Sequence, residues 1–247
     1  MCVIAVIPKG KPVDQADLKK CWNRNPDSAG YVFSSEGSLL IKRFLEWEPF
    51  IKHFVKDFEK SSLVSNFLVH FRIATSGGVN LDNCHPFSVN RDHAVVHNGV
   101  LGPGKGKKSD THLFRDEILT PLFSRNPKVL EDQVTMELLR RALGSSNKMV
   151  FMRRDGKYKI VNEAGGTWKA GLWYSNTHWD YTPPTMGYYK KGYWEKDHKA
   201  VSRFKKCFWC TTLTSNPDGF CNRCYNENNA YSDPFFASDK YPGIERP

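Results

Sequence analysis

The second residue of the chain is a cysteine, and its position gives it unusual chemical potential. Removal of Met1, which is efficient before a small residue, would leave Cys2 with both a thiol and a free α-amino group. An α-amine has a pKa of about 7.7–8.0, so near neutral pH it can accept the thiol proton. Position alone nevertheless favours an ordinary strand cysteine near a start codon, so other residues must decide whether Cys2 is a nucleophile.

Three polar positions further along could hold an amino-acid substrate beside such a nucleophile. Arg72, at the end of an apolar run, can bind a carboxylate through two parallel N–H groups. The Asn98 amide and the backbone N–H of Gly99 can stabilise an oxyanion. Asp110, at a helix start, can bind an ammonium group. Together with Cys2, these groups could hold an α-amino acid at both ends and attack its side-chain amide, as glutamine hydrolysis requires.

Each position also has a simpler interpretation. Arg72 could form a surface salt bridge, and Asn98-Gly99 is a common hairpin turn. Asp110 could serve only as a helix N-cap. Histidines of this region are more often packed and hydrogen-bonded than catalytic, and they are His70, His85 and His97.

The order of these residues resembles that of the class II glutamine amidotransferase family. That family begins with Cys and has H-x-R-x-A-T-x-G, N-x-H-P-F, H-N-G and S-D-T segments. After Cys2, this chain has matching segments at 70–77, 83–87, 97–99 and 109–111, in the same order. Residues 25–30 also resemble the family's early N-x-D-G-x-G loop, with Ser in place of the usual first Gly. The resemblance covers residues 2–176. Ile73 and Ser76 depart from the family pattern, so the resemblance does not determine the details of the substrate loop.

The resemblance implies a role for each matched residue. Cys2 would be the nucleophile with its own α-amine as base, while Asn98 and the Gly99 N–H would stabilise the tetrahedral oxyanion. Ammonia released from glutamine would pass to an acceptor. The glutamine-binding residues that the resemblance implies are Arg72 and Thr75 for the α-carboxylate and Asp110 for the α-amine.

The pattern of predicted elements favours an α+β fold, because strands and helices occur in groups rather than in strict alternation. The resemblance implies the four-layer αββα sandwich of N-terminal nucleophile hydrolases, and the cysteine spacing near the C-terminus separately predicts a small zinc-binding module. Residues 25–30 have the composition of a turn. Predicted strands cover 2–7, 31–33, 39–43, 67–72, 93–97, 149–152 and 158–161, and predicted helices cover 14–22, 48–60, 111–119 and 130–143.

The composition changes after residue 176, where periodicity fades and Tyr, Trp, Gly, Pro and Lys dominate. The predicted organisation is an amidotransferase domain at 2–176, a basic aromatic arm at 177–206, a cysteine module at 207–224 and a polar tail at 225–247. The module has the spacing C-x₂-C-x₁₀-C-x₂-C, which suits a tetrahedral zinc site. Such a site would be structural, since four thiolates leave no open position; reduced thiols or a redox pair are the alternative. The four expected ligands are Cys207, Cys210, Cys221 and Cys224.

The charge and the apolar runs limit the partners. The net charge is +10 and the pI is about 9.2, which favours anionic partners, nucleic acid among them. No apolar run approaches the roughly 18–20 residues of a membrane helix, so a membrane partner is not expected. Cysteines without a secretion signal predict a cytoplasmic protein. No P-loop is visible, so the ammonia acceptor is expected on a partner chain, with a site in the arm and zinc module, or no acceptor at all, as the alternatives. Two alternatives remain: an amidase of another γ-glutamyl compound, and a non-catalytic adaptor for nucleic acid or protein.

Overall fold

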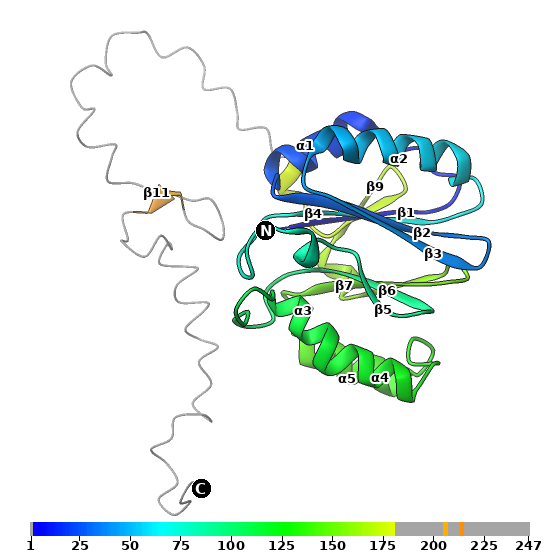
Figure 1. The fold of residues 1–247 in the computed structure, drawn as a ribbon, viewed down its shortest axis with the longest axis vertical. Coiled ribbons are helices and arrows are strands. Elements are labelled where there is room, and N and C mark those ends of the chain that lie inside the picture. The colour runs from blue at the N-terminus through cyan, green and yellow to red at the C-terminus, as the bar shows by residue number, and fades with distance from the viewer. Residues whose placement is uncertain (1, 181–204, 207–212, 215–247) are drawn as a thin grey trace, which may run out of the picture. The chain divides into compact units, whose positions relative to one another are not determined.

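The computed structural model describes residues 2–180, 205–206 and 213–214, and the chain divides into two units, Met1–Thr182 and Pro183–Pro247. The first unit contains two antiparallel sheets packed face to face (Figure 1). The six-stranded sheet has the order β3-β2-β4-β1-β10-β9, and the four-stranded sheet has the order β5-β6-β7-β8. The six strands of the larger sheet are β1 Val3–Ile7, β2 Ser28–Ser35, β3 Ser38–Phe44, β4 Phe67–Arg72, β9 Thr167–Lys169 and β10 Leu172–Tyr174.

The smaller sheet is built from β5 Phe87–Asn90, β6 His93–Asn98, β7 Lys148–Arg153 and β8 Tyr158–Val161. Helices cover the outer face of each sheet (Figure 1). Those on the larger sheet are α1 Gln15–Arg24 and α2 Trp47–Ser61; those on the smaller sheet are α3 Asp110–Phe114, the π-helical turn η2 Arg115–Leu119, α4 Thr120–Arg125 and α5 Gln133–Leu143. The layers therefore run helix, sheet, sheet, helix, which confirms the predicted α+β sandwich of this unit.

The remaining elements are short. The 3₁₀ turns are η1 Leu81–Asn83, η3 Glu163–Gly165 and η4 His178–Asp180, and the second unit has the two-stranded β11 Lys205–Lys206 and β12 Leu213–Thr214. Turn η4 packs against β10, because Trp179 is buried and its ring centroid lies 4.6 Å from that of Tyr174. Residues 178–180, assigned from sequence to the arm, thus lie with the folded unit.

Aromatic side chains fill the layer between the larger sheet and its helices. Phe33 stacks on Phe67 with ring centroids 4.6 Å apart, and Phe54 of α2 meets Tyr31 edge to face at 5.4 Å. Spacing of four residues along α2 directs Phe50 and Phe54 to the same face. Helix α1 begins as predicted, since the Asp14 side chain accepts a hydrogen bond from the Ala16 N–H at 2.8 Å. These contacts hold α1 and α2 on the outer face of the larger sheet.

A third cluster of buried side chains lies between the two sheets. Ile4 and Val6 of β1 and Leu68 of β4 belong to it, together with Ala94 and Val96 of β6. Successive residues of a strand point to opposite faces. The residues two positions beyond these on the same strands therefore share the inter-sheet face, and they include the polar residues on which the candidate site depends.

Three predictions of local structure need correction. Residues 28–30 belong to β2 rather than to a turn. The reason is packing: a Cβ on Gly30 would lie 2.1 Å from the carbonyl oxygen of His85, so glycine permits a close approach of strand and loop. The helix predicted at 111–119 is interrupted by η2 and continues to Arg125. Its N-cap is Ser109, whose side chain accepts from the His112 N–H, so an N-cap role for Asp110 is wrong.

In the part of the chain that the structure describes, no helix is long and apolar enough to cross a lipid bilayer.

Candidate active site

The candidate residues gather at one end of the inter-sheet layer. Strands β1 and β4 are antiparallel, with Val3 opposite Phe71 and Ile4 opposite His70. Continuing that register by one residue places Cys2 beside Arg72. Asn98, at the end of β6, shares a face with Val96 and lies next to the segment after β10. The sheet pairing therefore brings together residues that are far apart in the sequence.

Cys2 is half-buried at this end of the layer. Its Sγ lies 3.5 Å from the carbonyl oxygen of Ile73, and its own carbonyl accepts a hydrogen bond from Asn176 Nδ2 at 2.7 Å. Burial raises the pKa of the Cys2 thiol, although the backbone of Ile73 and the guanidinium of Arg72 act to lower it. A thiol whose pKa is raised stays protonated near neutral pH, so it needs a base before it can attack.

Arg72 is buried and organises the loop that follows β4. Its Nη1 donates to the Gly78 carbonyl at 2.8 Å, and its Nη2 donates to the Ser76 carbonyl at 2.7 Å. A surface salt bridge is therefore the wrong interpretation of this residue. A guanidinium has five N–H donors, so donors remain for a carboxylate. Thr75 is exposed in the same loop, and Asp27 fixes the loop by accepting from the Ala74 N–H at 2.7 Å.

Asn98 and Gly99 end β6 in a conformation that requires glycine. Gly99 has φ of 150°, and a Cβ there would lie 2.0 Å from Asn147 Oδ1. Strand β6 pairs with β7 on one side and with β5 on the other, so Asn98-Gly99 is not a hairpin turn, and that alternative is wrong. The Asn98 side chain is buried, with Nδ2 2.8 Å from Ser175 Oγ. Its Oδ1 has no hydrogen-bond partner among the described residues.

Asp110 is buried at the start of α3 and holds the loop that enters the helix. Its Oδ2 accepts from the Leu101 N–H and its Oδ1 from the Thr111 N–H, each at 2.7 Å. Its negative charge acts to raise the pKa of the Cys2 thiol, which places the two groups in the same electrostatic environment. Each carboxylate oxygen has two lone pairs, so an ammonium group can still be accepted.

Asn83 ties together the two loops that flank the site. Its Nδ2 donates to the carbonyls of Gly77 and Lys107, and its Oδ1 accepts from the Ser109 N–H at 2.9 Å. Sequence matching found Asn83 only as part of a motif and gave it no role. Its function as a bridge depends on loops that are separated along the chain.

The three histidines are buried, and burial lowers the pKa of each. Nε2 of His70 lies 3.0 Å from the His97 carbonyl oxygen. The two ring nitrogens of His97 lie 2.8 Å from Thr111 Oγ1 and 2.9 Å from Asn147 Oδ1. The His85 ring packs tilted against that of His70, with centroids 4.3 Å apart, but neither of its ring nitrogens has a partner among the described residues. These neutral rings support the strands that carry the site.

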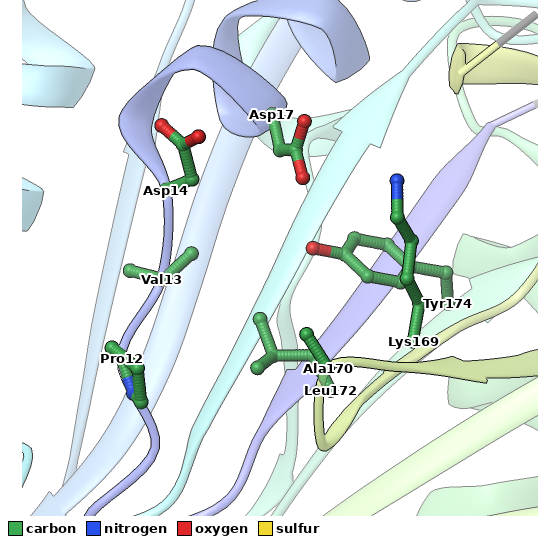
Figure 2. Close-up of a pocket in the computed structure, with 8 residues that line it drawn as sticks. All are labelled: Pro12, Val13, Asp14, Asp17, Lys169, Ala170, Leu172 and Tyr174. Carbon is green, nitrogen blue, oxygen red and sulfur yellow. The ribbon is translucent and has the colours of Figure 1, made fainter.

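A pocket of about 300 Å³ lies elsewhere, between the start of α1 and the β9–β10 turn (Figure 2). None of the predicted site residues lines it. Its charged groups already have partners: Asp14 caps α1, Asp17 pairs with Lys20 at 2.9 Å, and Lys169 pairs with Asp180 at 2.5 Å. We therefore assign no chemistry to this pocket.

Curated proteins similar to this chain are amidophosphoribosyltransferases. The rat protein is 30% identical over 166 residues, and the human protein is 28% identical over 166 residues. In both cases the match covers 58% of this chain. This similarity agrees with the resemblance of the sequence motifs to the class II glutamine amidotransferase family. The match covers only 31% of the length of these curated relatives. No protein-family model matches the chain.

Solved structures of this class also match, at low identity. A Bacillus subtilis glutamine phosphoribosylpyrophosphate amidotransferase has a TM-score of 0.41 at 14% identity, over 70% of this chain and 41% of that one. A glutamine aminotransferase class-II domain protein from Silicibacter pomeroyi has a TM-score of 0.34 at 16% identity, over 70% of this chain and 87% of that one.

The expected zinc ligands lie outside the described residues, so the structure does not bear on them. Within the described ranges, no group of three or more His, Cys, Asp or Glu side chains could hold a metal ion.

Proposed function

We propose that this protein hydrolyses the side-chain amide of glutamine through a thioester on Cys2 and supplies the ammonia to an acceptor. The observation that carries the proposal is the convergence of Cys2, Arg72 and Asn98 on the inter-sheet face at one end of the sandwich, with Asp110 nearby. The homology to glutamine amidotransferases supports the same chemistry. A cysteine with a raised thiol pKa also fits a nucleophile that waits for its own base.

The proposed reaction begins with Met1 removed. The free α-amine of Cys2 accepts the thiol proton, and the thiolate attacks the side-chain carbonyl carbon of glutamine. The Asn98 amide and the Gly99 N–H stabilise the oxyanion of the tetrahedral intermediate. Its collapse breaks the carbon–nitrogen bond, and the α-ammonium returns the proton so that ammonia leaves. Water then hydrolyses the thioester, which regenerates the thiol and releases glutamate.

Substrate recognition would come from the two buried charges. Arg72 would bind the α-carboxylate through donors that the loop carbonyls leave free, with the Thr75 hydroxyl beside it. Asp110 would accept from the α-ammonium group. A site with charges for both ends of an amino acid favours a substrate with free α-amino and α-carboxylate groups, such as free glutamine, over a glutamine residue within a peptide chain. A preference for γ-glutamyl peptides in glutamate-release assays would instead establish the amidase alternative.

Two assays on the full chain test the proposal. Glutamate should be released from glutamine, and a glutamine analogue with an electrophilic ketone in place of its amide should add one adduct per chain, at Cys2. Intact-mass and peptide mass spectrometry locate the adduct and show whether Met1 is absent. Cys21 and Cys84 are fully buried and serve as internal controls that should stay unmodified. Retained Met1, or an unmodified Cys2, would overturn the mechanism.

The fate of ammonia is a separate part of the proposal. The acceptor site would lie on a partner synthetase or transferase chain, and the net charge of +10 favours an anionic acceptor such as a nucleotide or nucleic acid. Co-purification from the native source, followed by ammonia-transfer assays with the recovered partner, tests this part. If Cys2→Ala retained every biological activity of the chain, the adaptor alternative would replace it.

We also propose a structural zinc ion bound by Cys207, Cys210, Cys221 and Cys224. The support is the donor set, since two closely spaced C-x₂-C pairs match the ligand number and softness that zinc prefers. One zinc per chain is expected by elemental analysis. The variant Cys207→Ser should lose it, while Cys21→Ser, which alters a buried cysteine of the first unit, should keep it. Equal zinc content in the two variants would contradict the assignment.

A further inference from the structure

Ser175 joins the strand of the nucleophile to the candidate oxyanion amide. It follows β10 and is fully buried. Its backbone N–H donates to the Ile4 carbonyl at 3.0 Å, and its Oγ accepts from the Ile4 N–H at 2.9 Å. The same Oγ lies 2.8 Å from the Asn98 side-chain amide. Ile4 lies two residues after Cys2 on the same strand face, so Ser175 connects both halves of the proposed reaction centre.

The orientation of the Asn98 amide follows from this network. With Nδ2 directed at Ser175, the hydroxyl accepts two N–H bonds, and the buried Oδ1 has no partner among the described residues. A hydroxyl has one donor hydrogen, and the two ends of an amide exchange places by a half-turn about the last side-chain bond. After that half-turn, Ser175 still accepts from Ile4 and now donates to Asn98 Oδ1.

The rotated amide pairs Oδ1 with the Ser175 hydroxyl and leaves the N–H₂ group as an available donor. Before the half-turn, Ser175 Oγ only accepts and Asn98 Oδ1 has no partner among the described residues; after it, the hydroxyl hydrogen of Ser175 and Oδ1 pair with each other, which favours the rotated form. Nδ2 then occupies the position without a protein partner, where it can donate to an incoming oxyanion. The same half-turn would not be held in place if residue 175 lacked a hydroxyl.

We propose that Ser175 is a positioning residue that fixes the Asn98 amide with its N–H₂ directed into the reaction centre. This inference rests on the proposed glutamine hydrolysis. Ser175 makes no contact with the substrate in this scheme and acts through Asn98 alone. The neighbouring Asn176, whose Nδ2 holds the Cys2 carbonyl at 2.7 Å, fixes the nucleophile in the same segment.

Steady-state kinetics of full-length variants provide the first test. Ser175→Ala should lower kcat for glutamine hydrolysis by about 10–100-fold, as loss of an orienting partner typically does, with KM within about twofold. Ser175→Thr retains the hydroxyl and should recover most of the activity. The matched control is Ser65→Ala, which removes another buried hydroxyl that accepts from the Ser34 N–H and donates to its carbonyl. An unchanged kcat in folded Ser175→Ala, or a change in KM alone, would overturn the proposal.

A double-mutant cycle separates positioning from general destabilisation. If Ser175 acts only through Asn98, then Asn98→Ala and the double variant Asn98→Ala/Ser175→Ala should have the same kcat within about twofold. A purely structural effect of Ser175 would remain in the double variant and multiply with that of Asn98. Such multiplication would overturn the positioning role.

Side-chain amide exchange tests the orientation without any turnover. In the ¹⁵N-labelled full chain, the Asn98 N–H₂ signals, identified by their loss in Asn98→Ala, should exchange rapidly because no protein acceptor holds them. Strong protection that disappears in Ser175→Ala would show that Nδ2 donates to Ser175, and would overturn the inference. Absence of glutamine hydrolysis by the unmodified chain would instead defeat the proposed function, so the two failures are distinguishable.

Discussion

The space between the two sheets has two halves that use the same strand alternation for opposite purposes. In one half, the inward positions are apolar and exclude water, as with Val6, Leu68 and Val96. In the other half, the next inward positions of the same strands are polar. The strands of the larger sheet contribute Cys2 and Arg72, and β6 contributes Asn98.

This contrast explains how one layer can carry both stability and chemistry. Apolar side chains need only be packed, whereas a buried polar group is costly unless it is hydrogen-bonded. Most polar groups of the site end therefore have protein partners, such as the two loop carbonyls that receive Arg72. The exceptions are informative. Asn98 Oδ1 has no partner among the described residues, and this is the position from which the rotated amide is proposed to donate to the oxyanion.

The largest effect is expected from a substitution that removes the nucleophile and leaves the packing intact. Cys2→Ala should lower glutamine hydrolysis by at least about 10⁴-fold, because no other group replaces the nucleophile. Its thermal unfolding should change little, since Cys2 is half-buried and its thiol makes only a long hydrogen bond, 3.5 Å, to the Ile73 carbonyl within the described part of the chain. Glutamate release and calorimetry on the same preparation measure both quantities. Full activity in Cys2→Ala would show that the reaction does not take place at the Cys2 end of the inter-sheet layer.

The converse change should break the packing and spare the chemistry. Leu68→Ala removes a fully buried side chain from the apolar half and should lower the free energy of unfolding by about 2–5 kcal/mol. Below its unfolding transition, the variant should keep its kcat for glutamine. Urea unfolding and steady-state kinetics provide the two measurements. A large loss of kcat in the folded variant would show that the halves are not separable.

Much of this contrast follows from the sequence, but not all of it. Local patterns correctly predict the strand that carries Arg72 and the helix capped by Asp14, because strand alternation and helix capping are short-range effects. They do not predict that Arg72 is buried. The role of Ser175 was also missed, since it arises only when β10 pairs with β1 and brings residues 4 and 175 together. Pairing between distant strands has no local signature.

A smaller effect is expected from the amide at the boundary of the two halves. Asn98→Ala should lower kcat by about 10²–10³-fold, the usual cost of removing one oxyanion donor, with little change in KM. The residual rate would come from the Gly99 N–H. The matched control is Asn83→Ala, which removes a buried amide that ties the flanking loops and should raise KM as those loops loosen. If Asn98→Ala altered KM alone, the amide would bind substrate rather than stabilise the oxyanion.

The smallest expected effect concerns pH and the histidine that separates the two halves. Burial lowers the pKa of His70 to about 3, whereas an exposed histidine titrates near 6.5. Below pH 6.5 the unfolded chain therefore binds a proton that the folded chain excludes, and stability falls as pH falls from about 6.5 towards 3. For His70 alone this amounts to about 1 kcal/mol between pH 7 and pH 5.5.

His70→Gln, which can still donate to the His97 carbonyl, should lose that share of the pH dependence, while His53→Gln at an exposed position of α2 should retain it. Urea unfolding at both pH values measures the difference, and equal pH dependence in the two variants would mean that His70 is not buried in its neutral form.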